Sequence, residues 1–203
     1  MAIISNAVTI ADAGAFSASL GSMTLIKTLT ASSSGTLSFV HGSSGVVFDN
    51  TYPIYKFVFT SIHPETQSNF SFQVDTGTNT NYNQTITSTS FYAEHSESDN
   101  TALSYFGSTD QAQGTGFQMI SHNPGVDNDS NCSGELTIFN PSSSTFVKHF
   151  IATSNSYNGS NTSHNNYVAG YVNTTTALTR VRFKFISGNM DAGIIKMYGI
   201  KDS

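Results

Sequence analysis

The chain has 203 residues and a formal net charge of −5, and only 10% of its residues are charged, against about 25% in an ordinary domain. Net acidity and scattered basic residues argue against a nucleic-acid partner, because phosphate binding needs clustered Lys and Arg. No apolar run reaches the roughly 18 to 20 residues that span a bilayer, which predicts no membrane partner. The single cysteine, Cys132, excludes an intramolecular disulfide bond.

Residues 1–23 are rich in Ala, Ser and Leu and predict an N-terminal extension, either an anchoring segment or an added strand. Within it, residues 10–20 are the best helix candidate of the chain, although Gly14 interrupts them. Terminal segments are ordered mainly where something holds them, so we expect the first ~20 residues to run along a neighbouring protein. Residues 24–203 show no linker and are predicted to form one domain.

Apolar and polar residues alternate along several segments of this domain, which indicates strands with one buried and one solvated face. In chain order these segments are TLSFV (36–40), YKFVF (55–59), NFSFQV (69–74), GELTIF (134–139), YVAGYV (167–172) and RVRFKF (180–185). In the third segment, Phe70, Phe72 and Val74 are predicted to lie inside, with Ser71 and Gln73 outside. Turns rich in Gly, Asn, Asp, Pro and Ser separate the segments, so we expect an all-β fold, an antiparallel β-sandwich.

The last part of the chain, residues 180–200, reads as two strands joined by a short turn. Arg182 and Lys184 give the first strand a solvated face, whereas only Lys196 interrupts the apolar second strand. An exposed apolar edge invites aggregation, so either a central place in its own sheet or a neighbouring subunit must cover this strand. The side chains predicted as interface contacts are Ile194, Met197, Tyr198 and Ile200.

Metal chemistry has weak support in the sequence. The six histidines are dispersed and none occurs in a His-Glu-x-x-His motif, so no zinc site is predicted. Asp127, Asp129 and Asn131 alternate like the first ligands of a calcium loop, but Cys132 stands where such a loop needs Gly. We interpret this segment as a polar loop, keep the three residues as candidate Ca²⁺ ligands, and expect no cofactor.

No catalytic residues are predicted either. The carboxylates Glu94, Glu97 and Asp99 lie close together in the sequence and could serve acid–base chemistry, but a solvated loop or a sheet edge explains them better. The chain has nine tyrosines and no tryptophan. Tyrosine side chains suit subunit interfaces as well as sugar platforms, and we favour the interface.

Several longer segments resemble structural proteins of marine tailed bacteriophages of the cyanophage and pelagiphage type. The resemblance covers most of the chain from about Thr24 and is carried by residues 50–66 (NTYPIYKFVFTSIHPET), 81–97 (NYNQTITSTSFYAEHSE), 133–150 (SGELTIFNPSSSTFVKHF), 169–185 (AGYVNTTTALTRVRFKF) and 188–200 (GNMDAGIIKMYGI). It implies a jelly-roll-like virion protein without enzymatic activity, and it transfers no catalytic residue to this chain.

The leading hypothesis is therefore a non-enzymatic virion structural protein that decorates the particle surface or forms a short capsid or tail appendage. Its expected partners are other virion proteins and further copies of itself, with a homotrimer favoured. The start of the chain lacks a basic segment, which predicts no signal peptide and fits assembly in a host cytoplasm. The alternatives are a tail-fibre or receptor-binding module for host surface glycans, a polysaccharide-degrading enzyme on a β scaffold, and a lectin-like adhesion domain.

Overall fold

The computed structural model describes residues 3–5, 8–12, 15–16 and 22–201, and strands are the regular structure of this part of the chain. Four strands form one sheet: β5 (Leu37–Val40), β7 (Phe70–Thr76), β10 (Gln118–Ser121) and β14 (Leu178–Phe185). Eight strands form the second sheet: β4 (Met23–Thr30), β6 (Ile54–Pro64), β8 (Ile86–Ser96), β9 (Thr101–Tyr105), β11 (Cys132–Phe139), β12 (Lys148–Asn158), β13 (Thr162–Val172) and β15 (Met190–Ile200).

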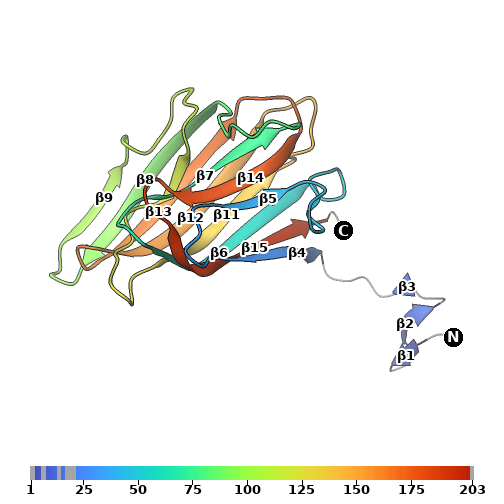
Figure 1. Ribbon diagram of the computed structural model, residues 1–203, viewed down its shortest axis with the longest axis horizontal. Helices are drawn as coiled ribbons and strands as arrows, with labels where there is room; N and C mark the ends of the chain where they lie inside the picture. Colours follow the sequence, from blue (N-terminus) through green and yellow to red (C-terminus); the bar gives the residue numbers. More distant parts are fainter. Residues whose placement is uncertain (1–2, 6–7, 13–14, 17–21, 202–203) are drawn as a thin grey trace.

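The two large sheets are antiparallel and pack face to face as a β-sandwich (Figure 1), which confirms the predicted fold class. The strand orders are β10-β7-β14-β5 and β4-β15-β6-β11-β12-β13-β8-β9. The chain changes sheets at most connections between β5 and β15, as in a jelly roll, and so no two neighbours in the smaller sheet are consecutive in sequence. No helix in the described part of the chain is long and apolar enough to cross a membrane.

Aromatic side chains from the inner faces of both sheets fill the core. Phe183 of β14 lies 5.4 Å, between ring centroids, from Phe57 of β6, and 5.9 Å from Phe70 of β7 in a stacked geometry. Phe72 meets Phe150 of β12 edge to face at 5.1 Å. All five rings are almost completely buried. The alternation in the sequence identified these inner faces correctly, because successive side chains of a strand point to opposite sides.

Loops cover the outer face of the smaller sheet. Ser71 and Gln73, which the alternation predicts outside, are in fact fully buried. The amide nitrogen of Gln73 donates hydrogen bonds to the carbonyl oxygens of Gln84, at 3.0 Å, and of Gly116, at 2.8 Å. The prediction was wrong here because two loops fold over β7, the one that directly follows it and a second one before β10, and the alternation within β7 carries no information about such loops.

The final two strands do not form a hairpin. β14 pairs with β5 and β7 in the smaller sheet, whereas β15 lies between β4 and β6 in the larger one. The turn between them therefore crosses from one sheet to the other (Figure 1). Of the two covers expected for β15, a central place in its own sheet protects both of its edges.

The N-terminal residues include three short strands, β1 (Ile3–Ser5), β2 (Val8–Asp12) and β3 (Ala15–Phe16), which pair with one another in a separate antiparallel sheet. The helix candidate at residues 10–20 is therefore extended wherever the structure describes it, at residues 10–12 and 15–16. Its other residues lie outside the described part of the chain. The division between an extension, 1–23, and a domain, 24–203, stays a prediction, and β4 begins at Met23.

Candidate functional site

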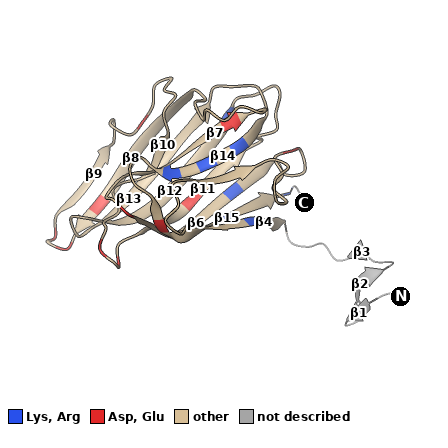
Figure 2. Ribbon diagram, in the orientation of Figure 1, with Lys and Arg blue, Asp and Glu red and all other residues tan. Residues whose placement is uncertain are grey.

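The outer face of the eight-stranded sheet is open and carries most of the exposed large apolar side chains in the described part of the chain. They are Met23, Leu25, Phe91, Leu103, Tyr105, Ile151, Tyr167 and Ile194. Charged side chains are sparse over the whole sandwich (Figure 2). At the middle of this face, Lys56 of β6 and Glu135 of β11 neutralise each other at 2.7 Å. Large exposed apolar surfaces of this kind mark interaction sites.

Aromatic side chains dominate the part of this face that β8, β9 and β13 form. The rings of Phe91 and Tyr167 stack at 4.9 Å between centroids with an interplanar angle of 8°. Tyr105 on β9 pairs with Phe91 in the strand register, and Leu103 pairs with Ala93. Since Tyr and Phe bury much area with little loss of side-chain entropy, this arrangement suits a contact with another protein.

A concave surface adjoins these rings. Ala169 of β13 pairs with Thr89 on one side and Ile151 on the other, and its small side chain leaves a depression between larger neighbours. This depression has a volume of about 500 Å³ and continues into a smaller one of about 160 Å³ beside Phe91 and Tyr167. We call the larger depression the hollow; its outward-pointing lining residues are Thr87, Thr89, Phe139, His149, Ile151, Ala169 and Tyr171.

A second apolar surface lies at the opposite end of the sheet, on β4 and β15. We call it the β4–β15 patch; it consists of Met23, Leu25, Tyr198 and Ile200, which pair across the two strands. Of the four interface candidates from the sequence, Tyr198 and Ile200 belong to this patch, and Ile194 is exposed farther along β15. Met197 is fully buried in the core of its own chain, so its side chain cannot contact a partner, because β15 alternates between the two faces.

The candidate calcium loop borders a polar depression of about 580 Å³, whose lining includes His63, Asp129, Asn131 and Asp191. Asp127 contributes its backbone carbonyl, 3.2 Å from His63 Nε2, and the Asn131 amide donates to the carbonyl of Asp129. Among the residues that the structure describes, no group of three or more His, Cys, Asp or Glu side chains could hold a metal ion.

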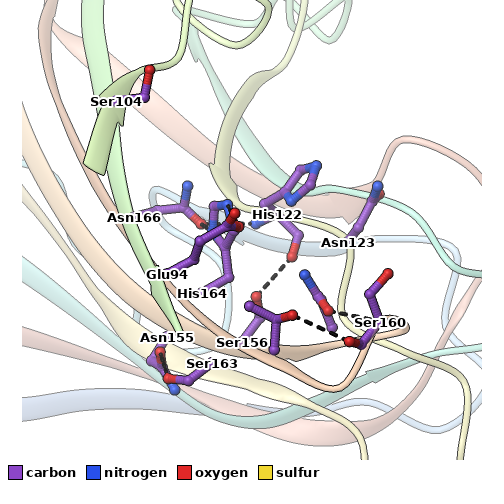
Figure 3. Close-up of polar contacts among 12 residues, drawn as sticks. Glu94, Ser104, His122, Asn123, Asn155, Ser156, Ser160, Ser163, His164 and Asn166 are labelled. Atoms are coloured by element: carbon purple, nitrogen blue, oxygen red, sulfur yellow. Dashed lines mark hydrogen bonds and ion pairs between the residues drawn. The ribbon is translucent and has the colours of Figure 1, made fainter. Parts of the chain in front are cut away.

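Two histidines that the sequence did not connect meet on the inner face of the larger sheet (Figure 3). His122, just after β10, lies 4.6 Å from His164 of β13 between ring centroids. His164 Nδ1 is 3.1 Å from Asn166 Oδ1, and His164 Nε2 is 3.7 Å from a carboxylate oxygen of Glu94. Tyr92 stacks on His164 at 4.6 Å. The residues of this histidine cluster come from segments that are distant in the sequence, so no local motif predicts the cluster.

Burial governs the protonation of the cluster. It lowers the pKa of His122 to about 4, assisted by the neighbouring His164. Burial also lowers the pKa of His164, against the opposing effects of Asn166 and Glu94. The hydroxyl of Ser156 donates to the backbone carbonyl of His122, at 2.7 Å, and is thus directed away from the imidazole rings. These contacts describe two neutral, packed histidines and not an activated nucleophile.

The sequence predicted a solvated loop or a sheet edge for the three clustered carboxylates; Glu97 and Asp99 lie in the turn between β8 and β9, and Glu94 pairs with Ala102 of the edge strand β9. Glu94 is a strand residue of β8, half-buried and close to His164. Glu97 accepts a hydrogen bond from Tyr157 at 3.5 Å, while Asp99 pairs with His95 at 3.0 Å. The partners differ for each carboxylate, so they do not form an acid–base pair.

Comparisons of the chain with protein-family models, curated proteins and solved structures found no match. The open outer face, the hollow and the β4–β15 patch are the largest apolar surfaces that the described part of the chain leaves exposed.

Proposed function

We propose that this chain is a non-enzymatic structural protein of a bacteriophage virion, which decorates the particle or builds a short appendage by packing its open sheet face against other subunits. The observation that carries the proposal is the concentration of exposed large apolar side chains on the outer face of the eight-stranded sheet. The virion is proposed on the sequence resemblance, and assembly in a host cytoplasm and a homotrimer are proposed with it.

The size of the face supports a role in assembly. Strands lie ~4.8 Å apart and residues along a strand ~3.3 Å apart, so an eight-stranded sheet with strands of up to 11 residues spans roughly 34 by 36 Å. This corresponds to roughly 1,200 Å², more than the ~800 Å² that each partner buries in a standard stable interface. Two of the charged side chains on this face, Lys56 and Glu135, already neutralise each other.

Two isoleucines with nearly equal exposure allow a matched test. Ile151 lies on the open face and is 52% exposed, whereas Ile186, after β14, is 51% exposed outside that face. We expect Ile151→Lys to abolish incorporation into particles and Ile186→Lys to leave incorporation unchanged, with both variants as thermally stable as the wild type. Normal incorporation of Ile151→Lys, or whole-particle reconstructions that lack the chain, would contradict the proposal.

A host glycan is the second candidate ligand, favoured by the polar depression beside His63, Asn131 and Asp191. Amide and carboxylate oxygens at the rim of such a depression could accept hydrogen bonds from sugar hydroxyls. In that case a glycan array should show binding that Asn131→Ala removes. An array without hits would exclude the receptor-binding role and leave the structural role intact.

A further inference from the structure

We propose that a row of basic side chains on β14 binds an extended acidic segment of a partner protein, one with Asp or Glu at alternate positions. The row, which we call the basic strip, consists of Arg180, Arg182 and Lys184. It lies on the outer face of the smaller sheet, on the side of the sandwich opposite the open face. A partner can therefore bind the strip whether or not the open face packs against other subunits.

The strip concentrates positive charge in a chain that has little of it. The chain has 8 Lys and Arg residues in total, and three of them occupy alternate positions of β14, where Figure 2 shows the blue segments in a row. Val181 and Phe183, which alternate with them, are fully buried in the core. Since successive side chains of a strand point to opposite faces, the three cations share the outer face at intervals of about 6.7 Å. Loops cover much of this face, but all three side chains remain partly exposed.

The cations of the strip have no carboxylate partner within the described part of the chain. There, the ion pair between Lys56 and Glu135 is the one that involves a Lys or Arg side chain. Asp75 pairs with Arg180 in the strand register, but its carboxylate accepts hydrogen bonds from neutral donors of residues 79–84. Among the described residues, the buried Arg180 Nε has no hydrogen-bond partner either. An oxyanion supplied from outside would compensate these charges.

Neighbouring side chains hold two of the cations in place without neutralising them. The Arg182 guanidinium carbon lies 3.7 Å from the centroid of the Tyr82 ring, and Arg182 Nε donates to Ser38 Oγ at 2.9 Å. Lys184 Nζ is 5.4 Å from the centroid of the Phe117 ring. A cation–π contact attracts the cation through the ring quadrupole and leaves its charge uncompensated. The strip is therefore preorganised, which lowers the entropy cost of binding an anion.

The spacing of the cations indicates the kind of partner. In an extended peptide every second side chain points to the same face, so carboxylates at alternate positions repeat at the same interval of about 6.7 Å. A single-stranded nucleic acid fits less well, because bases need exposed rings on which to stack, and Tyr82 is only 2% exposed beneath Arg182. So short a row of cations would also neutralise few phosphates.

Fluorescence anisotropy with two labelled synthetic peptides tests the spacing on the wild type alone. In the first peptide Glu and Thr alternate; the second has the same composition with every Glu before every Thr, so neighbouring carboxylates point to opposite faces. We expect the alternating peptide to bind about fivefold or more tightly than the block peptide, and high salt to weaken its binding. Equal affinity for the two peptides, or no binding of either, would overturn the proposal.

Substitutions then locate the binding on the molecule. Arg180→Gln and Lys184→Gln should each weaken binding of the alternating peptide about three- to fivefold. Lys27→Gln, at a half-buried position on β4 of the other sheet, removes the same charge and should leave the affinity unchanged. Equal weakening by Lys27→Gln would mean attraction to net charge alone and would reject the strip as the site. Tighter binding of a sulfated polysaccharide or of an oligothymidylate than of the alternating peptide would reject an acidic peptide as the partner.

Discussion

Acidification should destabilise the fold through the histidine cluster. Burial lowers the pKa of His122 from its ordinary 6.5 to about 4 in the folded chain. Between these pH values the unfolded chain binds more protons than the folded chain, so the free energy of unfolding falls as the pH falls. The full difference between these two pKa values corresponds to at most about 3 to 4 kcal/mol in the free energy of unfolding. Because His122 is only partly buried, solvent screening reduces the expected loss to about 1.5 kcal/mol.

The surroundings of His122 explain why protonation of its imidazole is unfavourable. His164 and Phe106 contact its ring, at 4.6 Å and 5.0 Å between centroids, and neither brings a negative charge to compensate for a buried proton. Glu94 is the nearby carboxylate, and it lies against His164 at 3.7 Å. Glu94 favours protonation of His164, but burial outweighs it and lowers the pKa of His164, so the second histidine adds to the same acid-induced loss.

Urea denaturation at pH 7.0, 5.5 and 4.5 measures this effect directly. His122→Phe keeps a ring in the cluster but cannot titrate, so the free energy of unfolding should fall by about 1.5 kcal/mol less over this range than in the wild type. His95→Phe, an exposed substitution outside the cluster, controls for the loss of a histidine. Equal pH dependence in the wild type and His122→Phe would refute the conclusion that this imidazole is neutral in the folded protein.

Two further substitutions probe buried contacts of the fold. Asp75 is fully buried and accepts hydrogen bonds from the loop that covers the smaller sheet. In urea denaturation, Asp75→Ala should lower the free energy of unfolding by about 3 kcal/mol. As the control, Asp127→Ala, at an exposed position, should lower it by about 0.5 kcal/mol or less. A Cβ added to Gly170 would lie 2.9 Å from the Phe150 ring, so Gly170→Ala should cost about 1 to 3 kcal/mol. Gly116→Ala, with open space around it, is the control, and equal melting temperatures would contradict the close approach.

The candidate site was only partly predictable. Tyr198 and Ile200 were predicted as interface residues because the second strand of the closing segment has too few polar side chains for a solvated face, and both lie half-buried on the outer face of the sheet. Met197 was assigned to the same interface because its neighbours are also apolar, and only the position of β15 between two strands of a sandwich tells which side faces the core. The hollow had no sequence signal, since Thr89, Ile151 and Ala169 come from three separate strands.

What the sequence by itself determined is the class of fold and the inner face of most strands, because alternation and turn chemistry are local properties of neighbouring residues. The tertiary structure decided which strands pair, and it separated β14 and β15 into opposite sheets although four residues join them. It also buried Gln73 under two loops and brought His122 to His164. These are long-range contacts, and they depend on how the sheets cover each other, which no short segment encodes.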